Sequence, residues 1–147
     1  MYEIHEVNGE DYADEINRFN ALFPDDFVPL KPRHLAKGHW WLVHLEHQTV
    51  GFAGMVPFEP FPRTGYFKRA AILKDHRGNG LQERLMTVRL TKAREATDWL
   101  RIVSECHVEN IASANNFIRA GFLLVEAERP WDKESLVWAK DLTDGTK

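Results

Sequence analysis

Residues 77–82 read Arg-Gly-Asn-Gly-Leu-Gln, and this stretch says more about fold and function than any other part of the chain. It follows a strand-like run, Tyr66 to Leu73, and leads straight into a run with helical periodicity. A strand that turns through two glycines into a helix directs several main-chain N–H groups at one point, where the helix N-terminus adds roughly half a positive charge. The stretch is therefore predicted to bind an anion, and a pyrophosphate would fit there.

The spacing of the two glycines separates this turn from other phosphate-binding loops. A Walker loop carries a Lys-Ser/Thr pair after its second glycine, and the dinucleotide fingerprint has three glycines and a ribose-binding acid in a βαβ unit. Residues 77–82 and their surroundings have neither arrangement. A nucleotide-phosphate binder is therefore disfavoured.

A second informative stretch begins at Asn110. Residues 110–122 read Asn-Ile-Ala-Ser-Ala-Asn-Asn-Phe-Ile-Arg-Ala-Gly-Phe. This run resembles one found in the GNAT N-acetyltransferase superfamily, Asn-x-x-Ala-x-x-x-Tyr-x-x-x-Gly-Phe. Residues 77–82 in turn resemble the coenzyme A loop of that family, Gln/Arg-x-x-Gly-x-Gly/Ala. Two independent matches in the order of the family are hard to obtain by chance, so the chain resembles this superfamily over nearly its whole length.

The resemblance implies an α+β fold of the acyl-CoA N-acyltransferase type, with a mixed central sheet of about seven strands and helices on both faces. A single domain is expected over residues 1–147. The implied activity is an acetyl-CoA-dependent N-acetyltransferase that moves an acetyl group to a primary amine by direct attack in a ternary complex. The partners would be acetyl-CoA and an amine on a small molecule or a protein, with the chain as a monomer or a homodimer.

In the family, the strand before the Gly-rich turn parts from the next parallel strand, and the gap receives the pantetheine arm. By position, the main chain of Ile72 and Leu73 would bond that arm, and Asn110 and Asn116 would add hydrogen bonds to the cofactor. Gln82 departs from the pattern because the family prefers Gly or Ala there, but a main-chain amide does not depend on the side chain, so binding is expected to be kept. The predicted cofactor-binding residues are Ile72, Leu73, Arg77, Gly78, Asn79, Gly80, Leu81, Gln82, Asn110 and Asn116.

Acyl transfer from a thioester to an amine needs a neutral amine, a polarised carbonyl and a proton for the departing thiolate. Glu105 occupies the position where some family members carry a Glu that draws a proton from the amine through water. It is therefore the predicted catalytic base, and a solvent-facing strand residue is the other interpretation. His107 is a weaker alternative base, and Glu59 in the Pro-rich loop is a third.

The proton donor is the point at which the resemblance fails. The usual Tyr of the family, seven residues after the Asn, is Phe117 in this chain. Either another group or water protonates the thiolate, or the thiolate leaves unaided, since a free thiol has a pKa of roughly 8.5. A non-catalytic acyl-CoA-binding or regulatory module is the alternative function that Phe117 and Gln82 favour. Cys106 is expected to be a buried structural thiol.

Composition limits the class of protein. The chain has 147 residues, 44% apolar and 28% charged, and a formal net charge of −3, which argues against a nucleic-acid binder that relies on bulk positive field. No apolar run approaches the ~20 residues of a membrane span, and the N-terminus lacks the features of a signal peptide. A cytoplasmic protein is expected, in agreement with the single Cys. The histidines show no zinc spacing, so no metal site is predicted.

Periodicity and turn residues predict the secondary structure. Glu46 to Thr49 are predicted to form a four-residue hairpin turn. In the predicted helix Leu81–Ala96, Arg89 is expected to face solvent and Ala96 to be buried. The predicted strands are Tyr2–Val7, Trp40–Leu45, Val50–Val56, Tyr66–Leu73, Trp99–Cys106, Phe122–Ala127 and Ser135–Ala139. The predicted helices are Tyr12–Phe23, a turn at His34–Lys37, Leu81–Ala96 and Ile111–Ala120, and Pro130 is placed in the last turn.

Overall fold

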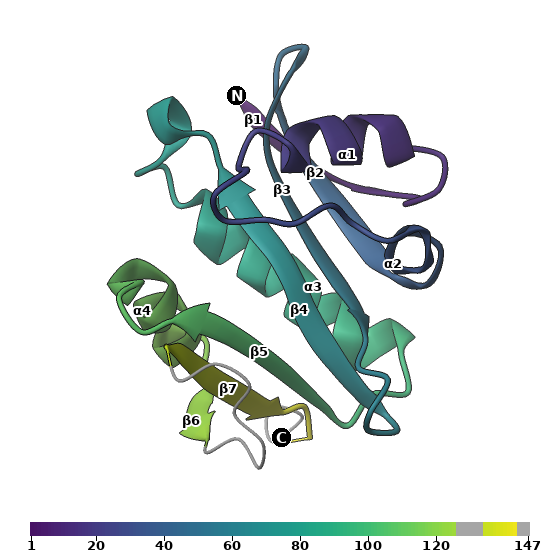
Figure 1. Ribbon diagram of the computed structural model, residues 1–147, viewed down its shortest axis with the longest axis vertical. Helices are drawn as coiled ribbons and strands as arrows, with labels where there is room; N and C mark the ends of the chain where they lie inside the picture. The colour runs from purple at the N-terminus through teal and green to yellow at the C-terminus, as the bar shows by residue number, and fades with distance from the viewer. Residues whose placement is uncertain (126–133, 144–147) are drawn as a thin grey trace. The chain divides into compact units, whose positions relative to one another are not determined.

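The computed structural model describes residues 1–125 and 134–143 (Figure 1). The predicted strand end at Ala127 and the turn at Pro130 lie outside these residues. The described elements are β1 Tyr2–Val7, α1 Ala13–Asn20, α2 Pro32–Lys37, β2 His39–Leu45, β3 Gln48–Pro57, β4 Thr64–Ile72, the 3-10 helix η1 Lys74–His76, α3 Leu81–Ala96, β5 Arg101–His107, α4 Ile111–Arg119, β6 Leu123–Val125 and β7 Ser135–Asp141.

In the described residues, seven strands form one sheet in the order β1-β2-β3-β4-β5-β7-β6. The sheet is mixed, because β4 pairs with β5 in parallel while β1 with β2, β2 with β3, β5 with β7 and β6 with β7 pair antiparallel. The predicted α+β fold with a mixed sheet of about seven strands is confirmed.

The chain divides into two compact units, Met1–Pro57 with Lys68–Leu85 and Phe58–Phe67 with Met86–Lys147. The core of the first unit forms where α1 covers the antiparallel strands (Figure 1). Ile16 of α1 is fully buried, and the ring of Phe19 lies 4.9 Å from that of Phe52 on β3. Trp40 is also fully buried, and its indole N–H donates to the carbonyl oxygen of His34 at 3.0 Å. Burial of each of these side chains contributes about 1.5–3 kcal/mol to the free energy of unfolding.

The hairpin between β2 and β3 is tighter than predicted. Leu45 pairs with Gln48, so the turn consists of Glu46 and His47 and the predicted four-residue turn is wrong. Glu46 has a φ of 56°, in the left-handed region that a two-residue turn requires. A register shift between Val43 and His44 accommodates the extra residue on β3.

The second unit is built around an aromatic cluster. Phe117 of α4 lies 5.1 Å from Phe122 and is stacked on Trp138 of β7 at 5.7 Å, measured between ring centroids. Phe67 on β4 contacts Phe122 at 5.8 Å. These side chains are all at least nine-tenths buried.

Two side chains of α3 differ from the predicted pattern. Ala96 is exposed, because it is the last residue of the helix. Arg89 is 3% exposed, and its guanidinium lies 4.1 Å from the ring centroid of Phe67. Burial lowers the pKa of Arg89 to about 9. The cation–π contact explains why a residue predicted to be solvated is found inside.

Glu15 links α1 to the β2–β3 hairpin. Its Oε2 atom accepts hydrogen bonds from the hydroxyl of Thr49 and from Nε2 of His44, the latter at 2.9 Å. Burial raises the pKa of the Glu15 carboxyl, but the bonds from Thr49 and His44 together lower it more, and the net pKa lies below its usual value. Because the folded pKa is depressed, the ionised carboxylate stabilises the fold above the unfolded pKa, and this stabilisation is lost as the pH falls through the folded value.

We predict that Glu15→Gln lowers the melting temperature at pH 7 by a few degrees, which corresponds to about 1 kcal/mol in a chain of this size. The difference from the parent protein should shrink as the pH falls through the depressed folded pKa of Glu15, where the parent carboxyl also becomes protonated. Thermal melts between pH 3.5 and 7 measure it, with the exposed Glu10→Gln as the control. A difference that is independent of pH would contradict this role of the Glu15 charge.

Candidate functional site

The turn between η1 and α3 has the geometry that its two glycines allow. Gly78 and Gly80 have φ values of 81° and 73°, in the left-handed region that side chains with a Cβ rarely adopt. A Cβ built at either position meets no atom within 4 Å. Conformation, and not crowding, is therefore what requires glycine at these positions, and the space beside the turn is open.

The turn also presents a row of hydrogen-bond donors. Within residues 1–125 and 134–143, the main-chain N–H groups of residues 78–82 donate to no other group of the protein. Residues 77–80 are exposed, and α3 begins at Leu81. The first N–H groups of a helix have no partner inside the helix, and the helix dipole adds positive potential. The geometry can hold an anion.

Side chains hold the turn in place. Asn79 folds back and donates from Nδ2 to the carbonyl oxygen of His76 at 3.0 Å. The hydroxyl of Tyr2 on β1 lies 3.0 Å from Nδ1 of His76. Gln82 donates from Nε2 to the carbonyl oxygen of Ala70 at 3.4 Å, so its side chain lies against β4. Sequence reasoning missed the support from Tyr2 and His76, because these partners are 74 residues apart.

Main-chain groups of Ile72 and Leu73, at the end of β4, already form hydrogen bonds within the protein. The N–H of Leu73 donates to the carbonyl oxygen of Val50 at 2.8 Å, and the carbonyl oxygen of Leu73 accepts from the N–H of His76 at 2.9 Å. The carbonyl oxygen of Ile72 accepts from Nε of Arg77 at 3.0 Å. A ligand at this strand end therefore has carbonyl lone pairs available, while the Leu73 N–H is taken.

Glu105 lies in the second unit and is half-buried on β5. Its Oε1 atom accepts a hydrogen bond from the hydroxyl of Tyr66 on β4 at 2.9 Å. The ring of Tyr66 stacks on Phe58 at 5.9 Å, and Phe58 in turn contacts Phe61 at 5.7 Å. A carboxylate oriented by a phenol hydroxyl can accept a proton from a bound ligand. Tyr66 was not singled out from the sequence, because its contact with Glu105 depends on strand register.

The parallel ladder between β4 and β5 sets that register. It runs from Thr64 opposite Arg101 to Tyr66 opposite Val103. At the next step, the hydroxyl of Ser104 donates to the carbonyl oxygen of Phe67 at 2.9 Å. A side chain thus bonds to β4 where a backbone group would continue the ladder.

The other predicted site residues of the second unit have local roles. Asn110 caps α4, because its Oδ1 atom accepts from the N–H of Ser113 at 3.1 Å. Asn116 accepts from Arg119 on the same helix at 2.5 Å. The two ring nitrogens of His107 are engaged, since Nδ1 accepts from the N–H of Glu109 at 3.1 Å and Nε2 lies 3.0 Å from Glu134. Glu59 is exposed in the loop before β4.

A comparison with protein families decides the classification. The profile of the acetyltransferase (GNAT) family matches residues 2–122. The chain belongs to the GNAT family. Membership supports acyl-CoA-dependent N-acyltransfer as the general class of activity. No functionally curated protein has a significant sequence match.

Solved GNAT structures share the fold. A candidate acyl-CoA N-acyltransferase from Klebsiella pneumoniae has a TM-score of 0.73 and 25% identity, over 97% of this chain and 98% of that chain. An N-acetyltransferase from Staphylococcus aureus has a TM-score of 0.77 and 13% identity, over 98% and 99%. NAA60 from Arabidopsis thaliana, in complex with a bisubstrate analogue, has a TM-score of 0.74 and 10% identity, over 96% and 98%. At such low identities, the last two likenesses concern the fold alone.

No group of three or more His, Cys, Asp or Glu side chains in the described part of the chain could hold a metal ion. Among the helices that the structure describes, none is both long enough and apolar enough to span a bilayer.

Phe117, at the position of the usual GNAT tyrosine, is a core residue in this protein. It is 7% exposed and lies between Phe122 and Trp138. The neighbouring thiol of Cys106 is buried as well, and its sulfur accepts from the indole N–H of Trp138 at 3.3 Å. The ring of Phe117 is therefore held in the aromatic cluster with Phe122 and Trp138.

We predict that Phe117→Tyr destabilises the protein by about 1–3 kcal/mol, because the added hydroxyl is buried among the rings of Phe122 and Trp138. The melting temperature should fall by several degrees, and acetyl transfer should not become faster. Both are measured on one preparation, with Phe61→Tyr in the exposed loop as the control. A faster variant of unchanged stability would show that the lost hydroxyl can be restored in place.

Proposed function

We propose that this protein is an acetyl-CoA-dependent N-acetyltransferase that moves the acetyl group to a primary amine by direct attack in a ternary complex. The whole chain, residues 1–147, acts as one such domain in this proposal. The observation that carries it is the row of main-chain N–H groups at residues 78–82, which donate to no group of the described protein and stand at the start of α3. A diphosphate is the part of acetyl-CoA that these donors suit.

The turn residues Arg77, Gly78, Asn79, Gly80, Leu81 and Gln82 hold the diphosphate through main-chain amides in this proposal. The end of β4 receives the pantetheine arm. Its open hydrogen-bonding capacity lies in the carbonyl groups of Ile72 and Leu73, because the Leu73 N–H is donated to Val50. Those carbonyls suit the amide N–H groups of pantetheine. Asn110 and Asn116 stabilise α4 through hydrogen bonds with Ser113 and Arg119, and in this proposal they also contact the cofactor.

Glu105 is the proposed base, and Tyr66 is its positioning residue. The amine nitrogen attacks the thioester carbonyl carbon, the carbon–sulfur bond breaks, and the amine loses one proton. Glu105 accepts that proton through water, and the hydrogen bond from Tyr66 orients the carboxylate for this step. His107 suits the role less, since both of its ring nitrogens already have partners. The thiolate takes its proton from solvent.

A non-catalytic acyl-CoA-binding module is the second candidate. The observation that favours it is the burial of Phe117 in the aromatic cluster, because a phenylalanine ring has no hydroxyl with which to protonate the thiolate. The two candidates share the donor site and differ in turnover. Release of CoA from acetyl-CoA in the presence of a panel of amines separates them.

Gly80→Asp is predicted to abolish binding of acetyl-CoA, because a negative charge at the turn repels the diphosphate by a few kcal/mol at ~4 Å and an effective dielectric constant of 20. Gly80→Asn is the matched control, since Asn has the same shape, no charge and a similar tolerance of the left-handed conformation. Calorimetric titration should show weak binding for the Asn variant and none for the Asp variant. Parent-like affinity in both would mean that the turn is only structural.

Glu105→Gln is predicted to lower kcat/KM by about 10² with affinity for acetyl-CoA unchanged, because it removes a base and keeps the shape. Tyr66→Phe should lower kcat/KM about tenfold, since the carboxylate remains but loses its orienting bond. The rate of the Gln variant should also lose its dependence on pH at the acidic end. Steady-state rates from pH 5 to 9 measure these effects, with Glu59→Gln as the control, and a parent-like rate in Glu105→Gln would move the base to another residue.

A further inference from the structure

The proposed base, Glu105, shares one face of the sheet with Tyr66. Tyr66 pairs with Val103 in the parallel ladder between β4 and β5, so these two side chains point to the same face. Glu105 follows Val103 by two positions on β5, and side chains two positions apart on a strand lie on one face. We call the face of the second unit that carries Tyr66, Val103 and Glu105 the Glu105 face.

The helices of the second unit lie on the opposite face. Phe67, the next residue of β4 after Tyr66, points to that side, where its ring lies 4.1 Å from the guanidinium of Arg89 on α3. The ring of Phe67 also contacts Phe122, which in turn contacts Phe117 of α4. Figure 1 shows α3 behind β4. In the described part of this unit, neither helix therefore packs on the Glu105 face, and both Tyr66 and Glu105 are only half-buried.

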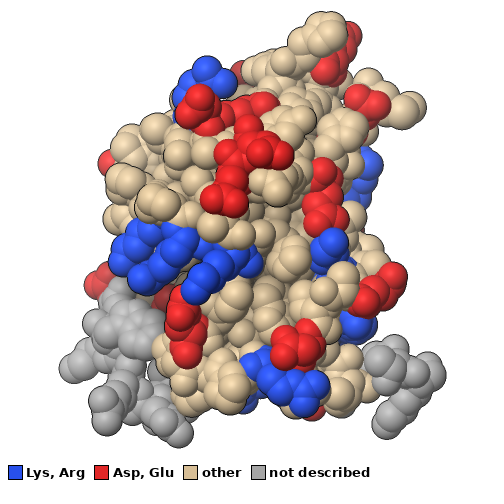
Figure 2. All heavy atoms as spheres, turned by 90° about the vertical axis from the view of Figure 1, so that its right-hand side faces the viewer, with Lys and Arg blue, Asp and Glu red and all other residues tan. Residues whose placement is uncertain are grey.

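In this unit, the side chains that the ladders place beside Glu105 are uncharged. Val137 of β7 pairs with Glu105, and Ala139 pairs with Val103, so both belong to the Glu105 face. Charged side chains of both signs are widespread on the side of the molecule that Figure 2 displays. The carboxylate of Glu105, by contrast, has Tyr66, Val103, Val137 and Ala139 as its ladder neighbours.

The charged residues of β5 on this face have other partners. His107, two positions after Glu105, lies 3.0 Å from the Glu134 carboxylate through Nε2. Arg101, four positions before Glu105, has its guanidinium 5.8 Å from the ring centroid of Phe61. A ligand at Glu105 that extends over β7 or toward Tyr66 thus meets apolar and aromatic groups.

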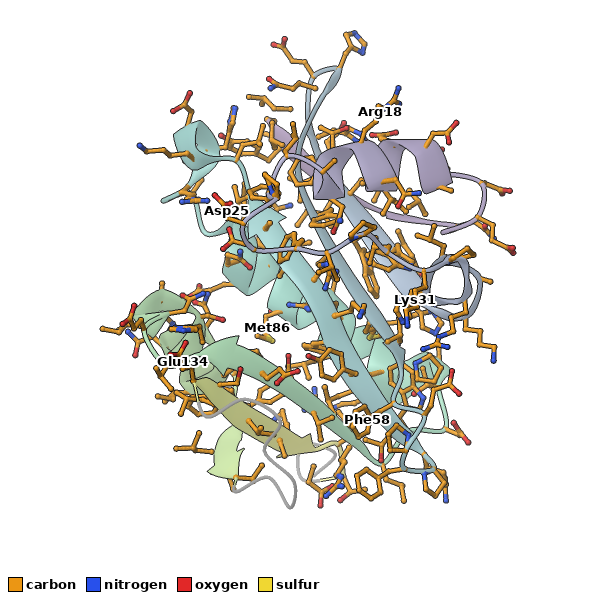
Figure 3. All side chains as sticks on the ribbon, viewed as in Figure 1. Arg18, Asp25, Lys31, Phe58, Met86 and Glu134 are labelled. Carbon is orange, nitrogen blue, oxygen red and sulfur yellow. The ribbon has the colours of Figure 1, made fainter. Side chains whose placement is uncertain are left out.

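Tyr66 joins the carboxylate to a second aromatic ring. Its hydroxyl donates to Oε1 of Glu105 at 2.9 Å, and its ring stacks on Phe58 at 5.9 Å, with 17° between the ring planes. The main chain holds Phe58 in place, because its N–H donates to the carbonyl oxygen of Thr64 at 2.8 Å and its carbonyl oxygen accepts from the N–H of Phe61 at 3.1 Å. Figure 3 shows Phe58 beside the start of β4. The ring of Phe58 is therefore fixed and half-exposed.

We propose that the acceptor is an arylalkylamine, a primary amine joined to an aromatic ring by a short alkyl chain, and that Phe58 selects the ring. This inference rests on the proposed acetyltransferase function, which brings the amine to Glu105. In the described residues, the hydrogen bond from Tyr66 engages only Oε1 of Glu105, so Oε2 can face the amine. The amine complements the carboxylate, and the apolar remainder matches its uncharged neighbours. A ligand ring beside Phe58 gains from offset-stacked or edge-to-face contact.

The test compares amines that differ in aromatic character and hardly in size. They are 2-phenylethylamine and 2-cyclohexylethylamine, with propylamine as the amine that lacks a ring. Rates are expressed per neutral amine, because the amines differ in pKa. For the parent, kcat/KM should be about tenfold higher for 2-phenylethylamine than for propylamine, since the ring buries apolar area. It should be about fivefold higher than for 2-cyclohexylethylamine, since only the aromatic ring gains the contact with Phe58.

The variants assign the preference to Phe58. Phe58→Leu keeps an apolar side chain and should bring the ratio of phenyl to cyclohexyl amine close to one, while Phe58→Tyr keeps the ring and should keep the ratio. Tyr12→Leu is the matched control, since it removes an exposed ring at the start of α1 in the first unit. Calorimetric titration of both amines into the protein with CoA measures the same preference without turnover. Melting temperatures confirm that each variant is folded.

Three results would overturn the acceptor inference. They are equal values of kcat/KM for the phenyl and cyclohexyl amines in the parent, an unchanged ratio in Phe58→Leu, and an equal loss of the ratio in Tyr12→Leu. Absence of acetyl-CoA binding by the parent, or binding without transfer to any amine, would instead contradict the proposed function and the acceptor inference with it. Titration of the parent with acetyl-CoA alone and the rate with propylamine distinguish these cases.

Discussion

The two left-handed glycines at the start of α3 are the constraint on which the donor site depends. Gly78 and Gly80, with φ values of 81° and 73°, reverse the chain within a few residues of the end of β4. The row of free N–H groups exists because the turn is neither helix nor strand, so that its donors have no internal acceptor. The open space around both Cα atoms leaves room for a ligand.

The carboxylate of Glu105 depends on a constraint of another kind. Its partner Tyr66 lies on a different strand, and the two side chains meet only because Tyr66 is paired opposite Val103 in the parallel ladder. A shift of one residue would turn Tyr66 to the other face of the sheet. The Ser104 hydroxyl helps to fix this register by bonding to β4 where the ladder ends. The position of the base therefore depends on how β4 and β5 pair, whereas the conformation of the donor turn depends on its local sequence.

This difference explains what could be predicted from the sequence. The turn at residues 77–82 and the Asn110 cap depend on a few neighbouring residues, and their positions were predicted correctly as a strand-to-helix turn and a helix start. The roles of these residues toward a cofactor stay predictions. Tyr66, whose partner is 39 residues away, was missed because single-sequence patterns do not reveal register. Arg89 was misplaced for the same reason, since the ring of Phe67 that covers it comes from a distant strand.

Charge acts on two length scales in this molecule. The net charge of −3 describes the field far from the surface, and it disfavours a polyanion that would have to lie across carboxylates as well as cations. Within a Debye length of about 8–10 Å, however, a small anion senses only the nearest groups. Burial first, and then the positive charges of Lys68, Arg33, Lys31 and Arg69, lower the pKa of His34, so the fields of these cations overlap at the histidine. The protonation state of His34 is therefore set by burial and by these nearby cations, although the protein is acidic overall.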